Sequence, residues 1–130
     1  MYVRFVLPTI DDDSGHEEGV FQVAARLRDS GELPVEFEAR LRSLFAWFRV
    51  HLDTPMRLSR STKAHKHKNA ISWFKPDARE HIEKTREMAL IIEQFSRLRP
   101  KMLVSKQVGY VVYEDDHQIV AVPFARKERR

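Results

Sequence analysis

A run of positively charged side chains in the middle of the chain is the feature that points most directly to chemistry. No Asp or Glu occurs between Asp53 and Asp77. The cations of this interval stand among serine and threonine hydroxyls and are Arg57, Arg60, Lys63, Lys66, Lys68 and Lys75. Cations neutralise phosphates and hydroxyls donate hydrogen bonds to phosphate oxygens, so the pattern is typical of a contact with nucleic acid or another polyanion.

Two aromatic residues follow the run of cations at once. Trp73 and Phe74 immediately precede Lys75, and an exposed aromatic ring can stack on an unpaired base with about 1–3 kcal/mol per base. We therefore predict nucleic-acid-binding residues at Arg57, Arg60, Lys63, Lys66, Lys68, Trp73 and Lys75. The alternative is a solvated loop followed by two aromatic residues that belong to the core.

The charge of the chain is unevenly distributed. The formal net charge is +4, but residues 54–76 alone carry six cations and no acid. The end of the chain adds Arg126, Lys127, Arg129 and Arg130 against Glu128, so the remainder is mildly acidic. Such a separation indicates an anionic partner more clearly than a uniform excess of positive charge would.

Metal-binding patterns are incomplete in this sequence. His65 and His67 lie on one side of an extended segment, but zinc normally takes three or four protein ligands and no third stands at a recognisable spacing. Another histidine, His81, is expected at the surface of a helix or at its boundary with the core. We predict no metal site and no cofactor.

Acidic residues cluster at two places. Asp11, Asp12 and Asp13 follow the first apolar stretch, and Glu114, Asp115 and Asp116 precede His117. Carboxylates at a strand end can hold magnesium for phosphoryl chemistry, so a metal-dependent, nuclease-like hydrolase is one alternative. Aspartates also make turns, because they bond their own backbone.

Other catalytic motifs are absent from the sequence. The four glycines form no phosphate-binding loop, there is no cysteine, and no spacing selects a Ser-His-Asp triad. We therefore favour a non-enzymatic binding or regulatory module over an enzyme. The main alternative is a protein–protein interaction module (an adaptor, an inhibitor or a homo-oligomer) that uses Trp47 or an edge strand, although we expect Trp47 to pack within the chain.

The apolar periodicity predicts the elements that must position these residues. We expect a strand over residues 2–10, a helix opened by a Ser14–Glu17 capping box and stopped near Gly31, and a second helix from Pro34 to about Asp53. A short strand over 70–74, a third helix from Pro76 to about Pro100 and a strand over 102–105 follow. The last pair, 109–113 and 117–122, reads as a hairpin closed at Asp115 and Asp116, with both faces covered. A two-residue loop would put Val112 opposite Ile119; because Asp-Asp is a weaker turn than Asn-Gly, a longer loop is the alternative.

Together these elements predict a single α+β domain. We expect three helices packed on one face of a mainly antiparallel sheet of three to five strands, in the order β-α-α-(β)-α-β-β-β. The domain covers residues 1–124, and residues 125–130 form a basic tail that we expect to be frayed. No apolar run is long enough to span a membrane and the start does not read as a signal peptide, so we expect a cytoplasmic protein without a membrane partner.

Overall fold

The computed structural model describes residues 1–11, 15–53 and 70–124. Its elements, in chain order, are β1 (Tyr2–Ile10), β2 (Glu17–Gly19), α1 (Val20–Asp29), α2 (Val35–His51), β3 (Ile71–Phe74), α3 (Arg79–Ser96), β4 (Lys101–Ser105), β5 (Tyr110–Glu114) and β6 (Gln118–Val122). Three helices and a mainly antiparallel sheet confirm the predicted α+β class. The sheet has six strands because β2 is added to those that were expected.

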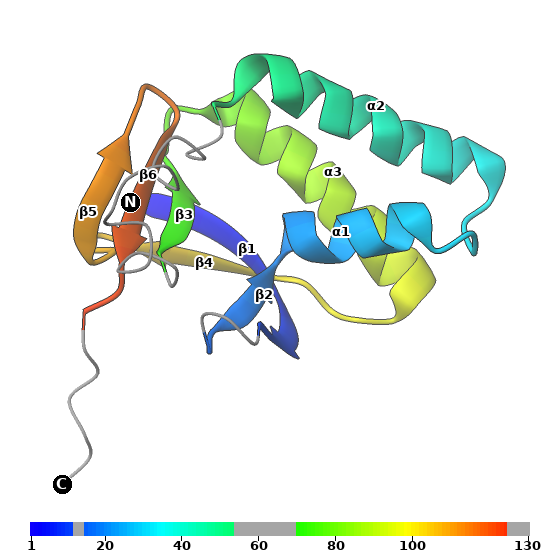
Figure 1. The fold of residues 1–130 in the computed structure, drawn as a ribbon, viewed down its shortest axis with the longest axis horizontal. Coiled ribbons are helices and arrows are strands. Elements are labelled where there is room, and N and C mark those ends of the chain that lie inside the picture. Colours follow the sequence, from blue (N-terminus) through cyan, green and yellow to red (C-terminus); the bar gives the residue numbers. More distant parts are fainter. Residues whose placement is uncertain (12–14, 54–69, 125–130) are drawn as a thin grey trace, which may run out of the picture.

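The long strand β1 organises the sheet. One of its edges pairs with β4, from Tyr2 opposite Ser105 to Val6 opposite Lys101. The other strands pair in the order β2-β1-β3-β6-β5, so β1 also pairs with both β2 and β3. Figure 1 shows β1 running from the β3, β6 and β5 end of the molecule toward the helices, and β4 running back beside it in the opposite direction.

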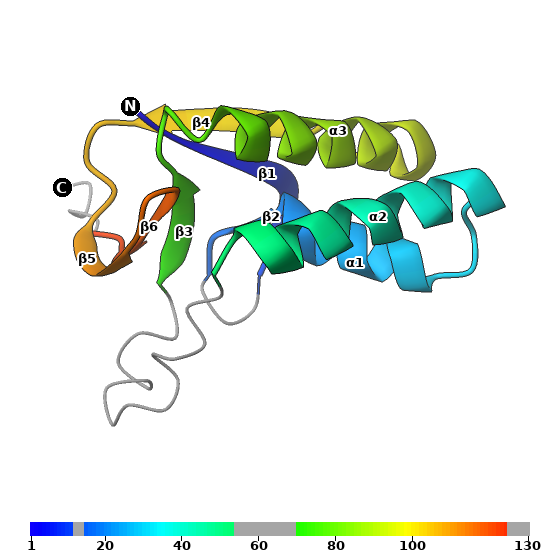
Figure 2. The same cartoon turned by 90° about the horizontal axis from the view of Figure 1, so that it is seen from above.

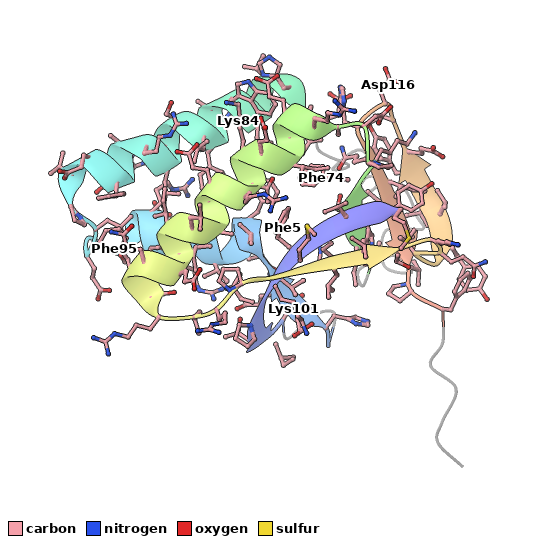
Figure 3. The ribbon with its side chains drawn as sticks, turned by 180° about the vertical axis from the view of Figure 1, so that it is seen from behind. Phe5, Phe74, Lys84, Phe95, Lys101 and Asp116 are labelled. Carbon is pink, nitrogen blue, oxygen red and sulfur yellow. The ribbon has the colours of Figure 1, made fainter. Side chains whose placement is uncertain are left out.

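The three helices bury their apolar faces against β1 and β3. They lie side by side, with the β5–β6 hairpin at the opposite end of the molecule (Figure 2). The main core joins Leu7 of β1 to Leu44 of α2 and Met88 and Ile92 of α3, which are all almost fully buried. Figure 3 shows Phe5 and Phe74 between α3 and the strands. The i, i+3, i+4 spacing of these apolar residues is why α2 and α3 form where the sequence predicts them.

A smaller apolar cluster lies apart from the main core. Val108, Ile119 and Ala121 form it, and Tyr2 and Trp73 pack against them. Strand β6 is therefore covered, as the sequence predicts. Its hairpin partner is not, because β5 is an edge strand whose Tyr110 and Val111 are 64% and 51% exposed.

The predicted start of the first helix is wrong. Glu17 belongs to β2, with Gly19 opposite Val6, and α1 begins only at Val20. The helix start is supported by the Gly19 N–H, which donates to Gln22 Oε1 at 3.2 Å. Ser14 lies outside the described residues.

The hairpin register predicted for a two-residue loop is also wrong, and the alternative of a longer loop is confirmed. Glu114, not Val112, lies opposite Ile119, and a register shift separates Val111 from Tyr113. The cause is the side chain of Asp115. Its Oδ1 accepts hydrogen bonds from the backbone N–H groups of residues 117 and 118, at 2.8 and 3.0 Å, which moves the turn toward the C-terminus.

Replacement of Gly109 tests how tightly the loop before β5 is held. Its φ is +128°, and a Cβ there would lie 2.1 Å from the carbonyl oxygen of Val122. We expect Gly109→Ala to lower the free energy of unfolding by at least about 3 kcal/mol, measured in urea, because backbone strain and a backbone clash add. Gly31→Ala is the control, since its φ is +76° with open space around it, and should cost about 1–2 kcal/mol. Equal losses in the two variants would contradict this description.

Candidate functional site

A groove of about 460 Å³ lies among α1, α2, β1 and β3. Apolar and aromatic side chains line most of it, and polar or charged groups line the rest. We call it the aromatic groove. Its lining residues include Arg4, Phe21, Phe45, Phe48, Arg49, Leu52, Asp53, Ser72, Trp73, Phe74 and Gln118. Its volume is in the range of ligand sites, roughly 300–1,000 Å³.

The aromatic side chains of the groove form one connected set. The Phe21 ring makes edge contacts with Phe48 at 4.8 Å, Phe45 at 6.2 Å and Phe74 at 6.4 Å between ring centroids. Phe48 and Phe74 are buried, whereas Phe21 and Phe45 remain half-buried. Mutual edge packing of this kind favours fixed ring orientations, so the groove has firm aromatic walls.

Arg4 of β1 places a positive charge beside these rings. Its guanidinium donates to the carbonyl oxygens of Ser72 on β3 and Glu17 on β2, each at 3.2 Å. Burial lowers the pKa of Arg4, and the nearby charges of Glu17 and Asp11 oppose this effect. The group stays cationic all the same. None of the ion pairs among the described residues involves it.

A buried amide holds the chain on both sides of residues 54–69. Gln118 is 2% exposed. Its Nε2 donates to the Asp53 carbonyl oxygen at 2.6 Å and to Asp115 Oδ2 at 3.1 Å, and its Oε1 accepts from Ser72 Oγ at 2.9 Å. Because buried polar groups are costly unless they are bonded, this network fixes the end of α2 relative to β3 and the hairpin turn.

A stack of histidines supports the same junction. His81 of α3 is buried, and its Nε2 lies 2.9 Å from the His51 carbonyl oxygen, to which it donates. Its ring stacks on His117 at 4.3 Å and meets the edge of Trp47 at 4.8 Å. The expected surface or boundary position of His81 is therefore wrong, because α3 packs here against the end of α2 and the hairpin turn. The internal packing expected of Trp47 is confirmed, since it also stacks on His51.

Two of the predicted nucleic-acid-binding residues lie in the described part of the chain. Trp73 is half-buried on β3, where it packs against the smaller apolar cluster and lines the aromatic groove. Lys75 follows β3 and pairs with Glu114 at 2.7 Å, and this hydrogen bond raises the pKa of Lys75. The other five, Arg57, Arg60, Lys63, Lys66 and Lys68, lie outside the described residues and stay predictions.

The acidic clusters are engaged in local bonds where the structure describes them. Asp11 Oδ1 accepts from Gln22 Nε2 at 3.2 Å, and Asp115 holds the hairpin turn. Within residues 1–11, 15–53 and 70–124, no group of three or more His, Asp or Glu side chains could hold a metal ion. Asp12, Asp13, His65 and His67 lie outside these ranges.

Sequence reasoning missed Arg4 and Arg49 as site residues. Arg4 shares a strand face with Tyr2 and Val6 in the period-2 pattern of residues 2–10. A charged residue between two apolar ones on one face was the available signal. Arg49 lies in the last turn of α2 and gave no signal, because a solvated helix position has the same pattern.

Comparison with known proteins gives no family for this chain. No protein-family model matches it, and neither a curated protein nor a solved structure matches it. In the part of the chain that the structure describes, no helix combines the length and apolar character needed to cross a bilayer. Function must therefore be argued from the geometry and charge of the site.

Protonation of His81 should make stability fall in mild acid. Burial lowers the pKa of His81 in the folded state below its ordinary value of 6.5, so the unfolded chain binds the proton first and its stabilising contribution is lost as the pH falls below about 6.5. We expect the free energy of unfolding to fall between about pH 7.5 and pH 5.5, by no more than about 1.4 kcal/mol per pH unit from this group. Urea unfolding of His81→Gln should show a shallower dependence; an unchanged slope would contradict the assignment.

Proposed function

We propose that this protein is a non-enzymatic binding module for an anionic partner, with nucleic acid favoured, and that residues 57–75 make the contact. The observation that carries the proposal is the segregation of charge. Six cations and no acid occur between Asp53 and Asp77 in a chain whose net charge is only +4. Neutralising phosphates with a local cluster of cations releases counterions, which is the main source of affinity in such contacts.

The residues that the structure describes on both sides of positions 54–69 support this proposal. Asp53 and Ser72 are tied to the same buried amide of Gln118, 2.6 Å and 2.9 Å away. Residues 54–69 carry five of the six cations. Asp53 and Ser72, which lie on either side of this segment in the chain, are therefore held together through Gln118. Tying the two ends together limits the conformational entropy that the interval can lose when it binds a partner.

Positive charge also borders the aromatic groove. Arg4 and Arg49 both line it, with Asp53 as the acid among the described lining residues. Lys75 is held by Glu114 and is 24% exposed, so it contributes less free charge than the sequence alone suggests. We assign phosphate contacts to Arg57, Arg60, Lys63, Lys66 and Lys68, and an accessory role to Trp73 and Lys75.

A protein-interaction module is the second candidate, and one observation favours it. Strand β5 has an unpaired edge in the described sheet, and Tyr110 and Val111 on it are 64% and 51% exposed. The Tyr110 ring meets Phe124 edge-on at 4.8 Å between centroids. An exposed apolar edge can accept a further strand from a partner chain or a second copy. Trp47 is engaged inside the molecule and is not needed for such a contact.

Salt dependence tests the proposed function. We expect the affinity for a labelled single-stranded oligonucleotide to fall with salt along a double-logarithmic slope of about −3 to −4, since each phosphate neutralised on a single strand adds about −0.7. Replacing Arg57, Arg60, Lys63, Lys66 and Lys68 by Gln should bring the slope close to zero and abolish binding at moderate salt. Fluorescence anisotropy measures both.

The matched control neutralises cations elsewhere on the surface. Arg79, Arg86, Arg97, Arg99 and Lys106 are exposed, and replacing these five by Gln should leave the slope almost unchanged. Binding that does not vary with salt, or an equal loss in both variants, would reject the proposal that the basic interval makes the contact.

A further inference from the structure

We infer that the aromatic groove receives an unpaired base, so that the preferred ligand is single-stranded nucleic acid and not duplex. This inference rests on the proposed function, and it adds a second subsite built wholly from described residues. The groove supplies three things that a flipped or unpaired nucleotide needs: aromatic surface, hydrogen-bonding groups and positive charge at its border.

The aromatic surface is the first requirement. Phe21 and Phe45 line the groove and are half-buried, whereas Phe48 and Phe74, which also line it, are buried. The Arg28 guanidinium already lies over the Phe45 ring, 4.7 Å from its centroid, so we assign the main stacking contact to Phe21. Every base has a π face, so a wall of rings binds bases with little regard to sequence. A pocket of about 460 Å³ is large enough for a ligand of this class.

Arg4 supplies the hydrogen-bonding groups. A guanidinium has five N–H donors, and the bonds described for Arg4 are one to Ser72 and one to Glu17, both to backbone carbonyls. The remaining donors lie at a group that is partly desolvated, where hydrogen bonds to an acceptor are stronger than in water. Base edges and phosphates present such acceptors, and an apolar ligand does not.

Charge complementarity decides between a nucleotide and a neutral apolar occupant. Arg4 is partly buried, and the nearby charges of Glu17 and Asp11 offset only part of its desolvation, so a phosphate would compensate this charge further and a purely hydrophobic ligand would not. Arg49 is exposed at the border of the groove and can neutralise a phosphate on the same strand. The groove thus combines apolar walls with cationic borders, as single-strand binding sites do.

The position of the groove connects it to the proposed phosphate contacts. Leu52 and Asp53 line the groove, and residue 54 follows them directly in the chain; Ser72 lines it just after the interval ends. A nucleic-acid strand with one base in the groove would therefore have its neighbouring phosphates close to Asp53 and Ser72, on either side of the basic interval. Paired bases are stacked inside a duplex and cannot enter without being unpaired and extruded.

The test compares three oligonucleotides with the same number of phosphates: a single strand, its duplex, and a single strand with abasic sites throughout its central part. We expect the intact protein to bind the single strand at least about tenfold more tightly than either of the others at the same salt. Fluorescence anisotropy with the full chain gives all three affinities.

The outcomes separate this inference from the proposed function. If none of the three oligonucleotides binds, the proposed function fails and the inference fails with it. If all three bind with equal affinity and the same salt slope, the phosphate-binding function stands and the base subsite is overturned.

Two pairs of variants locate the subsite. Phe21→Leu should weaken single-strand binding several-fold and leave abasic binding unchanged, whereas Phe95→Leu, at the far end of α3 against Phe37 (Figure 3), should change neither. If Phe21→Leu fails to fold by circular dichroism, the surface pair decides. Arg49→Gln should weaken single-strand binding and Arg79→Gln should not; an equal effect of these two would overturn the placement.

Discussion

The fold depends on how the β1 edge is shared by β2 and β3. Arg4 donates to a carbonyl oxygen of each strand at 3.2 Å, so one guanidinium joins residues 17 and 72, which are far apart in the chain. The guanidinium also packs beside Gly19, where a Cβ would lie 3.4 Å from Arg4 Nη2, at ordinary van der Waals distance. Burying a charge is expensive unless it is bonded, so the two carbonyls and the position of the strands are mutually dependent.

This constraint explains why the aromatic groove and the basic interval are neighbours. Arg4 fixes Ser72 relative to β1, and Gln118 fixes Ser72 relative to Asp53. The same three hydrogen bonds therefore shape one wall of the groove and hold the chain on both sides of residues 54–69. In the proposed function, the bonds of Arg4 and Gln118 hold the two ends of residues 54–69, and the cations of these residues make the phosphate contacts.

The sequence predicts the elements better than their connections. Strand β1, helices α2 and α3 and the short strand β3 were predictable because each has an apolar period over most of its length. Strand β2 was not, since Glu17, Glu18 and Gly19 have no strand pattern. Glu18 is buried there only because Arg26 and Thr9 bond its carboxylate, and these bonds also lower its pKa.

The site was predictable in its charge and not in its geometry. The acid-free interval is visible in the sequence. Arg4, however, becomes a site residue only because folding places Glu17 and Ser72, which are 13 and 68 residues further along the chain, next to its guanidinium. The prediction of the hairpin register was wrong for a similar reason, because one carboxylate, Asp115, determines where the turn closes. Such side-chain bonds to the backbone depend on tertiary structure and leave no period in the sequence.

Photocrosslinking can show directly whether a base enters the aromatic groove. A single-stranded oligonucleotide carrying a photoreactive base is irradiated with the intact protein, and the adducts are located by mass spectrometry. We expect adducts on groove residues such as Phe21, Phe45 or Trp73 and on peptides of the basic interval. Adducts confined to the exposed edge at Tyr110, Val111 and Phe124, or spread over the surface without preference, would contradict it.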